Sequence, residues 1–353
     1  MHGHLNGALI GLDWGTSSLR AFLIDAKGGV LAEERRPWGI MQLPPAPVGT
    51  IDANSKDGFA RAFDDVCGAW LQQQPGLPVI ACGMVGSAQG WTEARYLDTP
   101  VSLDQLAMQL TRVERALGTV VHIVPGLIRR GDLPDVMRGE ETQVLGVLAE
   151  LADIANTSPL LIGLPGTHSK WVSAKAGGIA QFTSYMTGEV FAALRQHTIL
   201  GRTMQSPGQP DDAAFVRGLR VVLPGPSSDD VQAAGTQAGL LSHIFSTRTL
   251  GLTGALPGTA QADYLSGLLI GHEVAALARQ YLGPAPSASV VKPSAAQHQL
   301  VLCGEPDLCR RYAMALEIAG FSAPQLARNA TVRGLWQIAC AAGLMGPVAN
   351  PNQ

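Results

Sequence analysis

The chain has 353 residues, 46% hydrophobic and 15% charged, which is long enough for two globular domains and too apolar for a mainly disordered protein. Its formal net charge of −3 offers no basic surplus to a nucleic acid. Five cysteines without a C-x-x-C pair predict neither a disulfide framework nor a thiolate zinc site. No apolar run approaches the roughly 20 residues that span a bilayer, and no signal-peptide pattern opens the chain. These features predict a reduced, cytoplasmic protein that binds neither nucleic acid nor membrane.

Residues 8–25 contain two apolar, β-prone stretches around a Gly-Thr-Ser-Ser turn. No helix-length segment separates the stretches, so the pattern predicts a β-hairpin. A helix with its N-cap at Ser102 and its stop at Gly118 is expected at residues 102–117. Further strands are expected at 30–36, 78–83 and 119–125, and further helices at 57–74 and 140–155.

The strand and its hydroxyl-bearing turn occur a second time in the chain. The Ile-Gly-Leu string at 162–164 and the Gly-Thr turn after it repeat the string at 10–12 and its turn. This repeat, about one domain length apart, predicts two related lobes, 1–155 and 156–353, unless the short strings coincide by chance. Helices are expected at 188–199, 213–223, 230–245, 262–281, 308–319 and 333–344, strands at 171–172, 179–182 and 300–303, and a surface loop at 284–293.

Several common nucleotide-binding and catalytic motifs are absent from the sequence. No two glycines are spaced as G-x-G, and no Gly-Lys pair could form a Walker A loop. H-E-x-x-H and G-x-S-x-G are missing as well. Any phosphate binding must therefore use another device.

The turn after the first strand could supply that device. Asp13 at the strand end could hold a hydrated Mg²⁺. Gly15 lets the backbone approach a phosphate, and Thr16 and Ser17 offer N–H and hydroxyl donors. Arg20 could contact phosphate or a substrate carboxylate in a bidentate way. The alternative is an ordinary hairpin turn with polar tips.

The second turn repeats the hydroxyls and adds a cation. Gly166, Thr167 and Ser169 correspond to the first turn, and two such turns could clamp a triphosphate. Lys170, in a chain with few lysines, is a candidate contact to phosphate or substrate. His168 is either a substrate contact or a structural turn histidine.

Four other segments could contribute to a site. Glu140 and Glu141 could supply a general base, although acids at a helix start are common. The glycine-rich loop with Ser87 and the loop with Arg130 could shape a small-molecule pocket, although each alone is more often only a loop. Gly304, between a strand and a helix, could let an adenine ring lie against the backbone.

Together these blocks carry a family resemblance. Residues 10–20, IGLDWGTSSLR, resemble the first phosphate motif of the actin-like ATPase and sugar-kinase superfamily. With Trp14 and Arg20 they are similar to the 2-dehydro-3-deoxygalactonokinase family, and the similarity runs from about residue 8 to 345. That family's further blocks resemble residues 83–91, 137–143, 164–171 and 185–191.

The resemblance implies an α/β fold of two ribonuclease-H-like lobes with mixed sheets and flanking helices. The active site would lie in the cleft between the lobes, and the final helix would pack back toward it. The implied reaction transfers the γ-phosphoryl group of ATP to the 6-hydroxyl of 2-dehydro-3-deoxy-D-galactonate, in galactose or galactonate breakdown. ATP and Mg²⁺ would be required, and the sugar acid would be the partner molecule.

The resemblance also implies roles for single residues. Asp13 would organise Mg²⁺, and Glu140 would act as base with Glu141 as its rival. The substrate carboxylate needs a cation, and the unranked candidates are Arg20, Arg130 and Lys170, with Ser87 and His168 as further substrate contacts. ATP would be held by Gly15, Thr16, Ser17, Gly166, Thr167, Ser169 and Gly304.

The chain departs from the superfamily at two places. Pro165 stands where many members have an acidic residue, so Asp13 would carry more of the metal binding. Glu305 follows Gly304 where a glycine pair is common, which makes the nucleotide preference less defined than phosphoryl transfer. Three alternatives remain open: a kinase for another sugar or sugar acid, an ATP- and sugar-binding regulator without turnover, and a phosphohydrolase. The sequence also leaves open whether the protein is a homodimer.

Overall fold

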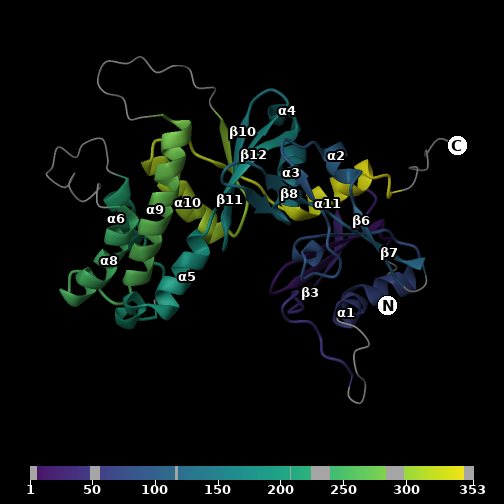
Figure 1. Ribbon diagram of the computed structural model, residues 1–353, viewed down its shortest axis with the longest axis horizontal. Coiled ribbons are helices and arrows are strands. Elements are labelled where there is room, and N and C mark those ends of the chain that lie inside the picture. Colours follow the sequence, from purple (N-terminus) through teal and green to yellow (C-terminus); the bar gives the residue numbers. More distant parts are fainter. Residues whose placement is uncertain are drawn as a thin grey trace. The chain divides into compact units, whose positions relative to one another are not determined.

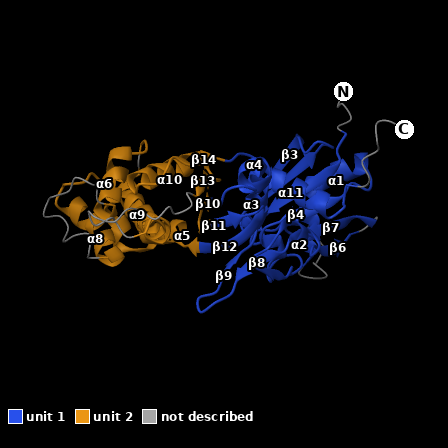
Figure 2. Ribbon diagram, turned by 90° about the horizontal axis from the view of Figure 1, so that it is seen from above, with its two compact units in different colours: residues 1–160, 172–183, 327–353 blue, residues 161–171, 184–326 orange. Residues whose placement is uncertain are grey.

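The computed structural model describes residues 6–47, 56–115, 118–206, 208–223, 239–283 and 298–345. The chain forms two compact units (Figure 2). Unit 1 comprises residues 1–160, 172–183 and 327–353, and unit 2 comprises residues 161–171 and 184–326. The lobe boundary expected at residue 155 rests on the repeated strand and turn in the sequence, and it stays a prediction. Within the described ranges, no helix combines the length and apolarity needed to cross a bilayer.

A six-stranded mixed sheet forms the centre of unit 1, in the order β3-β2-β1-β4-β7-β6. Figure 1 labels its two edge strands, β3 and β6, and the strand β7 beside β6. Strands β1 and β2 pair antiparallel, which confirms the expected hairpin, and β1 also pairs parallel with β4. The mixed α/β fold class is therefore confirmed. The strands are β1 (Leu9–Trp14), β2 (Leu19–Ile24), β3 (Val30–Arg36), β4 (Val79–Cys82), β6 (Thr111–Glu114) and β7 (Val120–Ile123).

A second, three-stranded sheet in unit 1 was not anticipated from the sequence. Its order is β5-β8-β9, and its strands are only three or four residues long, too short for a periodic signal. The strands are β5 (Tyr96–Asp98), β8 (Gly126–Arg129) and β9 (Asp135–Met137), and the helices of unit 1 are α1 (Asp57–Gln73), η1 (Met84–Gly86), α2 (Leu103–Ala107), α3 (Glu140–Glu150), α4 (Ala152–Ala155) and α11 (Ala330–Ala341).

The single helix expected at 102–117 is wrong. The N-cap at Ser102 is confirmed by a capping box with Gln105, but α2 spans only five residues. The strand β6 follows and pairs antiparallel with β7. Thr111 and Val113 are β-branched and share one face of β6, a pattern that the helical interpretation overlooked.

Aromatic packing anchors the end of β1 in the core of unit 1. Trp14 is fully buried, and its ring centroid lies 5.6 Å from that of Phe59 and 5.8 Å from that of Trp91. Its indole N–H donates to the carbonyl oxygen of Trp38 at 2.7 Å. The residue directly before the first turn is thus fixed by packing and by a hydrogen bond.

The last helix of the chain crosses α3 at very short range. A Cβ at Gly334 would lie 1.9 Å from the carbonyl oxygen of Thr142, and one at Gly146 would lie 1.9 Å from that of Ala330. Only glycine permits this approach, because the clashing atoms belong to backbone. The two helices therefore hold each other in one position within unit 1.

A second mixed set of strands has the order β12-β11-β10-β13-β14. The expected second strand–turn–strand is confirmed by β10 and β11. The expected surface loop at 284–293 and residues 230–238 of an expected helix lie outside the described residues. The strands are β10 (Leu160–Leu164), β11 (Ser169–Lys175), β12 (Gly178–Tyr185), β13 (Gln299–Leu302) and β14 (Gln325–Leu326), and the helices of unit 2 are α5 (Thr187–His197), η3 (Ile199–Thr203), α6 (Asp212–Val222), α8 (Gly239–Leu252), α9 (Gln261–Tyr281) and α10 (Pro306–Ile318).

The helix crossing gives a first prediction. Gly334→Ala should lower the free energy of unfolding by about 3 kcal/mol, because the new methyl group meets a backbone carbonyl that cannot move aside. Gly68→Ala in α1 is the matched control: nothing lies within 4 Å of its Cβ position, so stability should rise by about 0.5–1 kcal/mol. Chemical denaturation of both variants measures the difference. A Gly334→Ala protein as stable as the control would refute the close crossing.

Candidate active site

Backbone hydrogen bonds hold the first turn from two sides. The N–H of Gly15 donates to the carbonyl oxygen of Ser18 at 3.0 Å, which closes the turn. The N–H groups of Ile40 and Met41 donate to the carbonyl oxygens of Gly15 and Thr16 at 3.1 and 3.2 Å. The backbone carbonyl groups of the turn thus accept hydrogen bonds from within the protein, while Thr16 and Ser17 are exposed to solvent.

Asp13 and Arg20 lie opposite each other in the register of β1 and β2. Arg20 Nη2 contacts Asp13 Oδ2, and the side chains are 34% and 21% exposed, so both remain reachable. Thr16 and Ser17 at the tip are exposed. The structure therefore brings together a carboxylate, a guanidinium and two hydroxyls at one end of β1, as an anion site with a metal ligand requires.

Two glycines bring the start of α3 to this end of the sheet. Gly83, directly after β4, has φ +94°, and its Cβ would lie 2.8 Å from the carbonyl oxygen of Trp14. Gly139, directly before α3, has φ +106°, and its Cβ would lie 3.1 Å from the Cα of Gly83. Backbone contacts without side chains thus connect the first turn, the end of β4 and the start of α3.

The two adjacent carboxylates at the start of α3 differ in their surroundings. Glu141 is fully buried and accepts hydrogen bonds from the N–H of Gly139 at 2.6 Å and from Thr142 Oγ1 at 3.0 Å. Burial, together with the charge of Glu140, raises the pKa of Glu141 to about 8. Glu140 is only half-buried, and its Oε2 accepts from the backbone N–H of Arg138 at 3.1 Å. Glu141 is thus mainly a neutral acid at pH 7, and Glu140 is the carboxylate that a substrate can reach.

Sequence reasoning missed Arg138, whose Nη1 lies 3.0 Å from the Cβ position of Gly86, the residue before the predicted Ser87. Both side chains are buried, at 8% and 6% exposure. Arg138 Nη2 donates to the carbonyl oxygen of Ala94 at 2.7 Å, and its guanidinium lies 4.4 Å from the ring centre of Tyr96. Among the described residues, Arg138 Nε and Nη1 and Ser87 Oγ have no hydrogen-bond partner. The only sequence signal for this residue is its place directly before the Gly-Glu-Glu string.

Arg130 lies in different surroundings from the other predicted residues of unit 1. It follows β8 in the small sheet, and its side chain is 71% exposed. Its Nε donates to Asp98 Oδ1 at 2.5 Å. An exposed ion pair of this kind contributes little energy. The proposal that Arg130 binds the substrate carboxylate therefore has no support from burial.

The second turn, after β10, rests on the start of α5 in unit 2. Thr167 and His168 are exposed, and His168 Nε2 lies 2.5 Å from Glu189 Oε2. The N–H of Glu189 donates to the carbonyl oxygen of Thr167 at 3.0 Å. A Cβ on Gly188 would lie 2.4 Å from the carbonyl oxygen of Gly166, so the turn and the helix are in direct contact.

Ser169 and Lys170, which follow this turn, are buried rather than exposed. Ser169 Oγ donates to Glu273 Oε1 at 2.8 Å, and Lys170 Nζ donates to the carbonyl oxygen of His168 at 3.1 Å. On the neighbouring strand end, a Cβ on Gly304 would lie 3.2 Å from the carbonyl oxygen of Pro165. The structure thus places the expected adenosine glycine beside the second turn.

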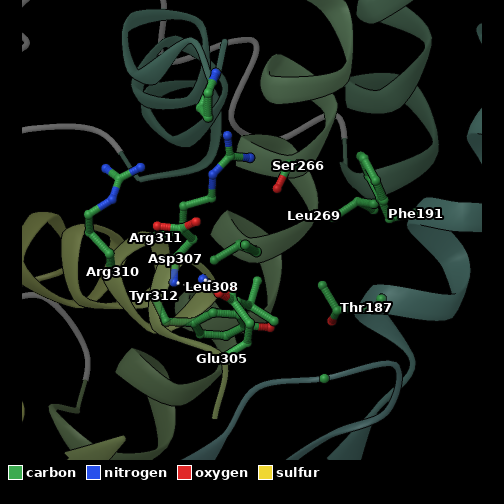
Figure 3. A pocket seen from close by; sticks show the side chains of 14 residues that line it. Thr187, Phe191, Ser266, Leu269, Glu305, Asp307, Leu308, Arg310, Arg311 and Tyr312 are labelled. Atoms are coloured by element: carbon green, nitrogen blue, oxygen red, sulfur yellow. Dashed lines mark hydrogen bonds between the residues drawn. The ribbon is translucent and has the colours of Figure 1, made fainter. Parts of the chain in front are cut away.

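A pocket of about 300 Å³ opens beside the second turn, within unit 2 (Figure 3). Its walls come from the turn and from α5, α9 and α10. Glu305 caps α10 by accepting from the N–H groups of Asp307 and Leu308 at 3.2 and 2.8 Å. Arg311 pairs with the buried Asp263. The lining residues are Gly166, Thr187, Gly188, Phe191, Pro210, Ser266, Leu269, Ile270, Glu305, Asp307, Leu308, Arg310, Arg311 and Tyr312.

The chain matches the family model described as 2-keto-3-deoxy-galactonokinase over residues 13–338. It is 36% identical over 275 residues to "Probable 2-dehydro-3-deoxygalactonokinase DgoK1" of Rhizobium meliloti (strain 1021), which covers 76% of this chain and 80% of that protein. It is 34% identical over 313 residues to the 2-dehydro-3-deoxygalactonokinase of Escherichia coli (strain K12), which covers 88% and 90%.

A crystal structure of a protein from Sinorhizobium meliloti assigned as a 2-dehydro-3-deoxygalactonokinase is 32% identical to this chain. It has a TM-score of 0.74 and covers 96% of this chain and 100% of its own. These matches define a sugar-acid kinase, a phosphotransferase to an alcohol group. The chain belongs to the 2-keto-3-deoxy-galactonokinase family.

The buried acid gives a pH prediction. The folded protein keeps the Glu141 proton up to a pKa of about 8, whereas the unfolded chain releases it near 4.5. The folded state therefore binds more protons in this window, and the free energy of unfolding should fall as pH rises from 5 to 8. Glu141→Gln removes this contribution, so its melting temperature relative to the parent protein should increase across the window.

The same substitution at the exposed Glu114 is the control, and its melting temperature should follow the parent protein at each pH. The measurement is thermal unfolding at pH 5 and pH 8. A parallel pH dependence of the Glu141→Gln and parent proteins would show that the carboxyl of Glu141 ionises normally.

Proposed function

We propose that this chain transfers the γ-phosphoryl group of ATP to the 6-hydroxyl of 2-dehydro-3-deoxy-D-galactonate. The products are the 6-phosphate and ADP. The acceptor follows from family membership and from the relatives that carry its name. The observation that carries the chemistry is the Gly83–Gly139 contact, which joins the exposed hydroxyl turn and the reachable Glu140 at one end of β1.

ATP binding is best supported in unit 2 by the second turn and the adjoining pocket. The exposed tip at Thr167 and the backbone of Gly166 suit phosphate oxygens. The pocket volume of about 300 Å³ suits part of a nucleotide, and Gly304 lies beside the turn. Lys170, which follows the turn in β11, supplies a cation whose Nζ donates to the carbonyl oxygen of His168.

Asp13 fits the role of a Mg²⁺ ligand. Magnesium in phosphoryl-transfer sites usually has one or two carboxylate ligands besides water and phosphate, and Asp13 is a partly exposed carboxylate beside the hydroxyl turn. Among the described residues, no group of three or more histidine, cysteine or acidic side chains is arranged so that it could hold a metal ion by itself. A bound Mg²⁺ would neutralise phosphate charge in that position.

Glu140 is the proposed base for the acceptor hydroxyl. Its carboxylate takes the proton of the 6-hydroxyl as the oxygen–phosphorus bond forms and the bond from the γ-phosphorus to the bridging oxygen breaks, with ADP as leaving group. Glu141 already carries a proton at neutral pH and cannot accept another. Arg20, beside Asp13, is placed to stabilise negative charge on phosphate or on the acceptor.

The function is tested by ADP release from Mg-ATP with a panel of acceptors. The panel contains both 2-dehydro-3-deoxy epimers, the galacto and gluco acids, with galactonate, glucose and N-acetylglucosamine. We expect turnover with the galacto keto-deoxy acid and a 6-phosphate product by NMR. Turnover only with another acceptor would refute the substrate, and ATP binding without acceptor-dependent ADP would refute catalysis in favour of a regulator.

A further inference from the structure

Glu273 is a buried carboxylate that the proposed reaction does not use. It lies in the middle of α9, only 3% exposed, among apolar neighbours such as Ile270 and Val274. A buried carboxylate is costly unless several hydrogen bonds replace its water. Its partners therefore show what the fold gains from this residue.

Four neutral side chains donate to the two oxygens of Glu273. Ser169 Oγ and Trp171 Nε1 donate to Oε1 at 2.8 and 2.6 Å. Tyr312 OH donates to Oε2 at 2.7 Å, and Thr187 Oγ1 donates to the same oxygen. The donors come from β11, α5 and α10, so one carboxylate of α9 connects three further elements of unit 2.

Two of these donors border the second phosphate turn. Ser169 follows directly after the turn, and Thr187 is the first residue of α5, on which the turn rests. Thr187 and Tyr312 also line the pocket beside the turn, where Figure 3 shows Thr187 across from the α10 side chains. Glu273 thus fixes the two sides of the turn and one wall of the pocket.

The direction of the hydrogen bonds limits what these side chains can do. The hydroxyl protons of Ser169 and Thr187 point to Glu273, so they are not available to phosphate oxygens. Burial and the charge of Glu273 raise the pKa of Tyr312, which keeps its hydroxyl a donor. Phosphate contacts are then left to the turn backbone and to Thr167, and Ser169 becomes a support of the turn.

We propose that Glu273 is a positioning residue that sets the second turn against α5 for phosphoryl transfer. The proposal rests on the proposed function in one respect, namely that this turn holds the ATP phosphates. Glu273 itself touches neither nucleotide nor acceptor. Its effect is transmitted through Ser169 and Thr187, and a small displacement of a phosphate-holding turn is enough to reduce catalysis strongly.

The first test is Glu273→Gln, which keeps the shape but replaces one accepting oxygen by a donor. We expect kcat to fall by about tenfold or more. The KM for the acceptor should stay within about twofold, because the residues proposed to act on the acceptor, Glu140 and Arg20, belong to unit 1. ADP should bind more weakly while adenosine, which has no phosphate, binds as before. A protein with merely weakened packing would not separate ADP from adenosine.

A matched pair of variants decides the question even if Glu273→Gln does not fold. Ser169→Ala and Trp171→Phe each remove one donor to the same oxygen, Oε1, but only Ser169 adjoins the turn. Ser169→Ala should lower kcat and ADP affinity. Trp171→Phe should lower the melting temperature more, since its ring is part of the core, and leave both quantities near those of the parent.

The outcomes separate this proposal from the proposed function. Acceptor-dependent ADP release by the parent protein tests the function alone. ADP and adenosine affinities, measured by calorimetry, test the role of Glu273 whatever the acceptor is. Equal ADP affinity in Ser169→Ala and the parent, or an equal loss in Trp171→Phe, would overturn the proposal.

Discussion

The contact of Gly83 with the end of β1 on one side and with Gly139 on the other is the constraint on which the site of unit 1 depends. Both glycines have positive φ, and a Cβ on Gly83 would lie 2.8 Å from the carbonyl oxygen of Trp14. Such backbone contacts leave no room for adjustment, so the turn after β1 and the start of α3 have a fixed relation. The carboxylates of Asp13, at the end of β1, and Glu140, at the start of α3, are therefore carried on backbone that has a fixed position.

Two further features support this arrangement from outside the site. The aromatic packing of Trp14 fixes β1 in the core of unit 1. The close crossing at Gly146 and Gly334 fixes α3 against α11, which lies much later in the sequence. In unit 2 the corresponding task falls to a polar group, Glu273, which collects four hydrogen bonds around the second turn. The two turns thus share a strand–turn–strand pattern but differ in how the fold supports them.

Local pattern predicted the elements that carry the turns, because hairpins and amphipathic helices are encoded by neighbouring residues. The short sheet and β6 were missed or misassigned, since their strands are only three or four residues long and carry little periodic signal. Glu140 and Glu141 are adjacent in sequence, and only burial separates a neutral acid from a reachable carboxylate. Glu273 had a usable signal, because it is a lone acid inside an apolar helix segment, although it matches no metal motif.

We propose that the glycine contact presents Glu140, and not Glu141, to the acceptor hydroxyl. It is tested most directly by kcat for Glu140→Gln and Glu141→Gln under saturating Mg-ATP and 2-dehydro-3-deoxy-D-galactonate. We expect kcat to fall by about 100-fold or more for Glu140→Gln, while its affinity for ADP is retained. Glu141→Gln should keep most of the activity, because glutamine resembles a protonated glutamate. A larger loss of kcat in Glu141→Gln than in Glu140→Gln would contradict this proposal.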